Sequence, residues 1–133
     1  MLGEKISEET IKTTGRRVTS VEGEPIVETS AQGVGNLFGV DYQMMVTYTG
    51  KLRADGVIAG QGRGVLMGKG GETATFTAQG LGKFNQQGGI SWRGMSFIQS
   101  SHPKWSRLNA IPAAWEYELD AEGNGPGTLH EWR

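Results

Sequence analysis

The chain has 133 residues, the size of one domain, and no cysteine, which excludes a disulfide framework, thiolate chemistry and cysteine-ligated metals. Thirteen basic and fourteen acidic side chains give a net charge of −1, which argues against a nucleic-acid partner and against a basic membrane-surface protein. No apolar run approaches the ~20 residues of a spanning helix, and the N-terminal segment does not resemble a signal peptide. We therefore expect a cytoplasmic, single-domain protein over residues 1–133.

The predicted elements begin after an ambiguous start. Residues 1–14 mix charged and polar side chains, and either an N-terminal arm along the domain or a short helix would fit them. Further on, side chains alternate with the period of two that is typical of half-buried antiparallel strands. Turn-forming segments divide these runs, whereas the segment at 101–112 breaks the alternation and reads as a loop with one helical turn. The pattern predicts strands near residues 15–21, 25–31, 40–51, 56–67, 72–84, 89–99, 111–119 and 127–133.

Glycine is the outlying residue type, since 22 glycines exceed twice the ~7% of average usage. Residues 61–71, QGRGVLMGKGG, do not match a phosphate-binding loop because Gly70 follows Lys69 where serine or threonine is required. Gly60, Gly62 and Gly64 fall on one face of a predicted strand. Glycine in that position marks a bend, a bulge or close approach of other groups, and we expect a barrel corner here.

These strands predict an all-β fold: a single antiparallel eight-stranded β-barrel. Sequential antiparallel strands remove their exposed edges by closing on themselves. A barrel of this strand number either is filled by side chains or has room for one small ligand. Strand alternation by itself leaves a sandwich of the same strands as an alternative.

Few residues have the context of a catalytic or metal site. His102 and His130 lack the short spacing to other ligands that a metal site requires, so no metal and no cofactor is expected. Arg93 follows Trp92 in the middle of a strand; if it faces the lumen, it needs a carboxylate partner, and Glu116 on the next strand is the first candidate. An outward, solvated Arg93 is the equal alternative.

Aromatic residues on the faces assigned inward are the other lead. Beside glycine-rich strands they could wall an apolar pocket with a few hydroxyl groups, as small-molecule sites usually are, or they could simply be core. The predicted ligand-binding residues are Tyr42, Met44, Tyr48, Phe76, Trp92, Arg93, Trp115, Glu116 and Tyr117.

Glycine and aromatic spacing also carries a family resemblance. The runs DGVIAGQGRGVLM, ATFTAQGLGKF and SWRGMSF, followed by WEYELDAEGNG, resemble the small barrels related to allene oxide cyclase, in particular bacterial proteins of unknown function with that fold. The likeness covers about residues 40–120 and implies an eight-stranded barrel, commonly oligomeric, with an apolar cavity. No cyclase catalytic motif matches residue by residue, so it implies no activity. Another calycin-like barrel, similar to lipocalins or avidin, is the alternative.

Three functions fit this sequence. The leading hypothesis is a module that binds a small apolar molecule in its lumen. The second is a cyclase or isomerase that uses the same cavity, and the third is a homo-oligomeric structural protein with a filled core. A buried Arg93–Glu116 pair would favour catalysis, an apolar lumen would favour binding, and exposed apolar side chains on the outer wall would favour assembly.

Overall fold

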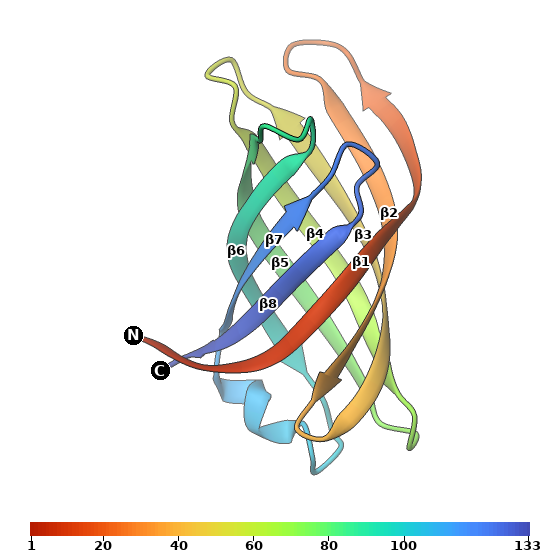
Figure 1. Cartoon of the computed structure of the whole chain (residues 1–133), viewed down its shortest axis with the longest axis vertical. Helices are drawn as coiled ribbons and strands as arrows, with labels where there is room; N and C mark the ends of the chain where they lie inside the picture. Colours follow the sequence, from red (N-terminus) through yellow and green to blue (C-terminus); the bar gives the residue numbers. More distant parts are fainter.

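The computed structural model covers all 133 residues and shows a closed barrel of eight antiparallel strands in chain order, with β8 pairing back to β1 (Figure 1). The predicted fold class is therefore confirmed, and closure excludes the sandwich. No helix of the structure has the length and apolar character needed to cross a membrane. The elements are β1 (Leu2–Ser20), β2 (Ile26–Leu37), β3 (Val40–Leu52), β4 (Ile58–Gly68), β5 (Thr73–Phe84), β6 (Ile90–Gln99), the 3₁₀ helix η1 (Ser106–Ala110), β7 (Ala113–Leu119) and β8 (Gly125–Trp132).

Strand β1 differs most from the sequence prediction. It begins at Leu2, so residues 1–14 form part of the barrel wall rather than a separate arm or a short helix. Its first half pairs with β8 and its second half with β2. Register shifts between Lys5 and Ser7 and between Thr13 and Gly15 break the period of two. Alternation predicted only the later part of β1, at 15–21, and these irregularities contribute to that.

Each two-strand hairpin turn contains one glycine with a left-handed backbone, with φ between 71° and 91°. Only glycine adopts this conformation without strain, and the predicted turn segments are confirmed on this ground. One turn was missed. Residues 32–37, which lie between the strands predicted at 25–31 and 40–51, continue β2 to a tight turn at Phe38 and Gly39.

The other glycines make room for aromatic rings. Every aromatic residue of the inner face stands directly across from a glycine on a neighbouring strand. A Cβ atom added at Gly64 would lie 2.5 Å from the Phe76 ring, and one at Gly60 would lie 2.8 Å from the Trp92 ring. The expected corner in β4 is absent, since its pairing runs without a register shift. The pairs are Tyr42–Gly35, Tyr48–Gly62, Phe76–Gly64, Trp92–Gly82, Trp115–Gly94 and Tyr117–Gly127.

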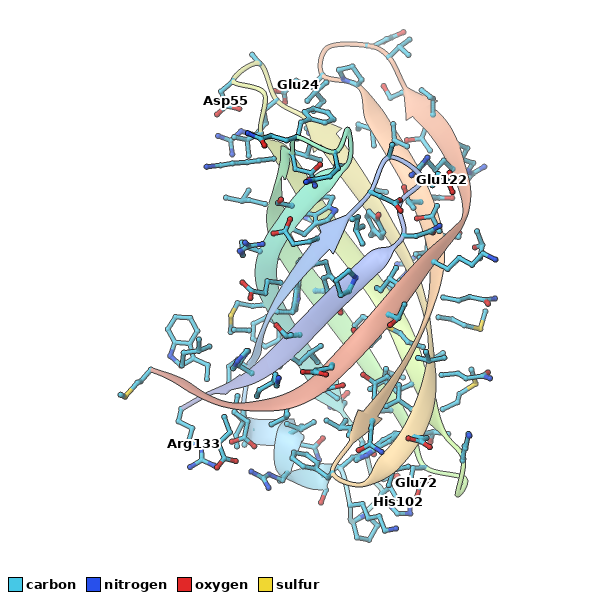
Figure 2. All side chains as sticks on the ribbon, viewed as in Figure 1. Glu24, Asp55, Glu72, His102, Glu122 and Arg133 are labelled. Carbon is cyan, nitrogen blue, oxygen red and sulfur yellow. The ribbon has the colours of Figure 1, made fainter.

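One end of the barrel is closed by the segment between β6 and β7, which contains η1 and confirms the predicted helical turn (Figure 1). Trp105 is fully buried there, and its indole N–H donates a hydrogen bond to the Leu37 carbonyl at 3.1 Å. Its ring meets Tyr42 edge-on with centroids 6.2 Å apart. Glu72 and His102 mark this end in Figure 2, while Glu24, Asp55 and Glu122 lie at the opposite end. The segment between β6 and β7 therefore acts as a plug, and its buried side chains, Trp105 and Leu108, fill this end of the lumen.

Candidate functional site

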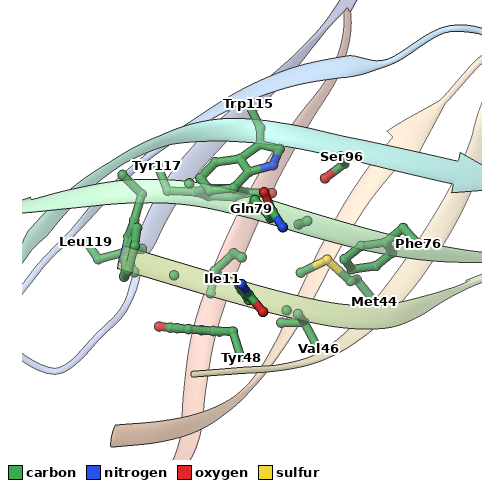
Figure 3. Close-up of a pocket in the computed structure, with 16 residues that line it drawn as sticks. Ile11, Met44, Val46, Tyr48, Phe76, Gln79, Ser96, Trp115, Tyr117 and Leu119 are labelled. Carbon is green, nitrogen blue, oxygen red and sulfur yellow. The ribbon is translucent and has the colours of Figure 1, made fainter. Parts of the chain in front are cut away.

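The middle and upper lumen retains a cavity of about 80 Å³ (Figure 3). Apolar and aromatic side chains from β1, β3, β5, β6 and β7 form most of its wall, and Gly60, Gly62 and Gly80 complete it on β4 and β5. Because the rings lie against the glycines of neighbouring strands, they line the wall instead of filling the centre. Of the predicted site residues, the structure brings six together around this cavity: Met44, Tyr48, Phe76, Trp92, Trp115 and Tyr117. Their role in ligand binding stays a prediction.

Arg93 and Glu116 lie elsewhere, on the outer wall. They face each other across β6 and β7 as expected, with Arg93 Nε 3.2 Å from Glu116 Oε2, and Arg93 also pairs with Glu118 at 3.0 Å. All three side chains are about half exposed. Of the two orientations left open for Arg93, the structure shows the outward one, so Arg93 and Glu116 do not line the lumen: Trp92 points inward, and the next residue along a strand points to the opposite face. The pair is a solvated surface contact of small energetic value.

The polar group of the lumen is instead a buried cluster around Glu9. Tyr42 and Tyr117 each donate a hydrogen bond to one oxygen of the Glu9 carboxyl group. The Ser7 hydroxyl lies 2.8 Å from the Tyr42 hydroxyl and extends the cluster. Glu9 is 4% exposed, and Tyr117 connects the cluster to the cavity because its ring lines the wall. Tyr42, one of the predicted ligand-binding residues, lies deeper and belongs to this cluster.

Register explains how residues from distant strands meet at Glu9. On β1, Glu9 stands opposite Gly35 of β2 on one side and Gly127 of β8 on the other. Gly35 in turn pairs with Tyr42, and Gly127 pairs with Tyr117. The row Tyr42–Gly35–Glu9–Gly127–Tyr117 therefore crosses five adjacent strands. Each tyrosine ring lies over a glycine and reaches the carboxyl group from its own side, and we call this arrangement the Glu9 row.

Glu9 differs from the other buried glutamates in having no basic partner. Glu131 pairs with Arg107 and Arg133, and Lys104 Nζ lies 4.0 Å from Glu72. Burial raises the pKa of Glu9 above its ordinary value of 4.5, and the two tyrosine hydrogen bonds oppose this shift. Burial, with the adjacent carboxyl group, also raises the pKa of Tyr42 and Tyr117 above the ordinary 10.0. Of the three groups, the Glu9 carboxyl group is therefore the one that loses its proton at the lowest pH.

This shift predicts a pH dependence of stability. Since the folded state holds the Glu9 proton more tightly than the unfolded state does, the contribution of Glu9 is fully present below about pH 4.5 and is lost as pH rises through its folded pKa. We expect Glu9→Gln to remove this loss. As pH rises, the free energy of unfolding of Glu9→Gln should increase relative to that of the wild type, by about 1.4 kcal/mol for each unit by which the pKa of Glu9 is raised. Urea unfolding of both proteins between about pH 5 and about pH 8 measures the difference, and parallel curves would contradict the prediction.

Sequence reasoning missed Glu9, Ser7 and Ser96, of which Ser96 lines the cavity and is buried. Ser96 could have been assigned inward from the period of two that places Trp92 inward on the same strand. Glu9 had no such signal, because Ser7 and Glu9 face inward but are polar, so this part of β1 shows no alternation of apolar and polar residues.

The histidines take no part in this site. His102 lies in the segment before η1, where its Nδ1 accepts the backbone N–H of Lys104 at 3.2 Å. His130 stands on β8 opposite Lys5 and Ala114, between two buried residues whose side chains face the other way. No group of three or more histidine, aspartate or glutamate side chains is placed to hold a metal ion.

Comparison with solved structures finds the same fold in three bacterial proteins. A β-barrel-like protein from Acinetobacter baumannii matches with a TM-score of 0.83 at 10% identity, covering 100% of this chain and 96% of its own. A protein of unknown function from Clostridium acetobutylicum matches at 0.80 and 10%, covering 98% of each chain. A conserved protein of unknown function from Rhodopseudomonas palustris matches at 0.79 and 12%, covering 98% and 97%.

These likenesses confirm that the chain is a small barrel similar in fold to bacterial barrels of unknown function, as the sequence resemblance implied. At such low identity the comparison speaks for the fold alone. No protein-family model matches the chain, and no curated protein matches it. The function must therefore be argued from the cavity itself.

Proposed function

We propose that the protein binds a small, mostly apolar molecule in the barrel lumen. The cavity of about 80 Å³, walled by aromatic and aliphatic side chains, is the observation that carries this proposal. An apolar cavity of about 150 Å³ in another protein stays dry and binds benzene. By that measure the lumen takes a molecule of only a few heavy atoms, or the narrow end of a longer one.

The wall supports a binding role because its shape is fixed before a ligand arrives. Trp92 and Trp115 each rest on glycines of neighbouring strands, where a Cβ atom at Gly60 or Gly82 would lie within 3.0 Å of the Trp92 ring. Tyr48 meets Trp92 edge-on with centroids 5.7 Å apart. Rings held in this way lose little conformational freedom when a ligand binds, which favours affinity.

The distribution of charge favours binding over the cyclase or isomerase alternative. The Arg93–Glu116 pair, which would have favoured catalysis had it been buried beside the cavity, is exposed on the outer wall. The buried carboxyl group of Glu9 already accepts two tyrosine hydrogen bonds. The cavity wall is thus mostly apolar, as a carrier or storage site requires.

A cavity-filling variant tests this proposal. Ala78 lines the cavity on β5, and Ala78→Leu replaces its methyl group by an isobutyl group. We expect at least about tenfold weaker binding of methylenecyclobutane, a small apolar probe, in a titration followed by tryptophan fluorescence. We also expect unchanged or higher thermal stability, since filling a void stabilises whereas overpacking a full core costs about 1–3 kcal/mol.

The matched control is Thr77→Leu, which adds bulk to the exposed outer face of the same strand. It should bind the probe as the wild type does. Equal probe binding by Ala78→Leu and the wild type, or no binding by the wild type, would contradict a ligand site in the lumen.

A further inference from the structure

Two of the four tryptophans have indole N–H groups without a partner. Trp105 donates to the Leu37 carbonyl, and the side chain of Trp132 is 49% exposed to solvent. The indole N–H groups of Trp92 and Trp115 are buried, and neither donates a hydrogen bond to any acceptor. Nearly all buried donors in proteins are paired, because an unpaired donor has lost its hydrogen bond to water without a replacement. Both unpaired donors belong to rings that line the cavity.

We propose that the ligand of the lumen carries an acceptor oxygen, a carbonyl or an ether, that accepts a hydrogen bond from the indole N–H of Trp115. This inference rests on the proposed function of the cavity. Figure 3 shows the indole nitrogen of Trp115 on the side of the ring toward Ser96. Ser96 lies two residues from Gly94, the cross-strand partner of Trp115, so its hydroxyl-bearing side chain is a diagonal neighbour on the same inner face. These two residues place polar groups side by side on a wall that is mostly apolar.

The Glu9 row indicates that this oxygen belongs to a neutral group. Tyr117, which lines the cavity beside Trp115, uses its hydroxyl to bind Glu9. A ligand carboxylate would lose its hydration against a wall that offers it no basic side chain, and an ionised Glu9 would repel it as well. A ligand cation would face indole N–H donors that it cannot satisfy. Ketones, aldehydes, esters and ethers of few heavy atoms are the classes that fit both constraints.

Two probes of nearly the same shape test the inference. Cyclobutanone carries a carbonyl oxygen where methylenecyclobutane carries a CH₂ group, so the pair differs mainly in the acceptor. We expect cyclobutanone to bind about tenfold more tightly than the hydrocarbon, after allowance for their different partition from water into an apolar solvent. In ¹⁵N-resolved NMR spectra it should move the indole N–H resonance of Trp115, while that of Trp105 stays in place.

The variant Trp115→Phe keeps an aromatic ring over Gly94 and removes the donor, with Trp132→Phe as the exposed control. Trp115→Phe should lose the preference for the ketone and still bind methylenecyclobutane, whereas Trp132→Phe should behave as the wild type.

The outcomes separate the two proposals. Equal binding of both probes, or ketone binding that leaves the Trp115 resonance unmoved, would overturn the acceptor inference and leave the lumen site intact. Failure of both probes to bind would overturn the site and the inference together.

Discussion

Replacing Gly127 by alanine is expected to lower the free energy of unfolding by about 3 kcal/mol, the upper part of the range for overpacking a full interior. A Cβ atom at this position would lie closer than 3.0 Å to three atoms of the Tyr117 ring. The ring cannot simply turn aside, because its hydroxyl donates to the buried carboxyl group of Glu9. The methyl group therefore either displaces β8 from β7 or breaks the hydrogen bond to Glu9.

Urea unfolding followed by circular dichroism measures this loss, and Gly15→Ala is the matched control. Gly15 also lies in a strand, but a Cβ atom there meets nothing within 4 Å. Its substitution should change stability by less than about 1 kcal/mol, with a gain expected from reduced freedom of the unfolded chain. Similar values for the two variants would show that the Glu9 row does not depend on glycine at 127.

Trp105→Ala is expected to cost about 3–5 kcal/mol, the range for removing a buried tryptophan. The side chain is fully buried in the plug, and its loss would leave the Leu37 carbonyl without the indole donor. It would also remove the edge-on contact with Tyr42, one of the two tyrosines that hold Glu9. We therefore expect the closed end of the barrel to become less stable and Tyr42, in the Glu9 row, to lose its contact with the Trp105 ring.

The exposed Trp132 supplies the control for this experiment, since Trp132→Ala removes the same group from the surface. Its effect should stay below about 1 kcal/mol. Hydrogen exchange would locate the change, with faster exchange at the end of β2 and the beginning of β3 in Trp105→Ala. A Trp105 variant as stable as the Trp132 variant would mean that the segment between β6 and β7 is not a structural plug.

Much of the wall could be predicted because a period of two fixes which side chains face inward. Tyr42, Tyr48 and Phe76 were assigned to the lumen on this ground, and the structure places them there. The same rule should have placed Arg93 outside, since its neighbour Trp92 was assigned inward. Arg93 was named as a candidate because it is a charged residue beside an aromatic one, although its position next to the inward-facing Trp92 predicts that it faces outward.

The glycine–aromatic pairs were beyond sequence reasoning because they depend on register. Both pairs are near in sequence, but Gly35 meets Tyr42 only once β2 is known to continue through its glycines to Leu37. Glu9 joins both pairs only when β1 closes the barrel between β2 and β8. The cluster therefore forms only when the barrel closes, and the local sequence pattern could not predict it.

We expect the lumen to keep an apolar, ligand-sized space between its glycine-backed aromatic rings. Diffraction from crystals pressurised with xenon tests it most directly, because xenon enters empty apolar cavities and scatters strongly. We predict one xenon atom between Trp92, Trp115 and Phe76 in the wild type, and none in Ala78→Leu. Wild-type crystals with no xenon inside the barrel would show a filled core and contradict the account.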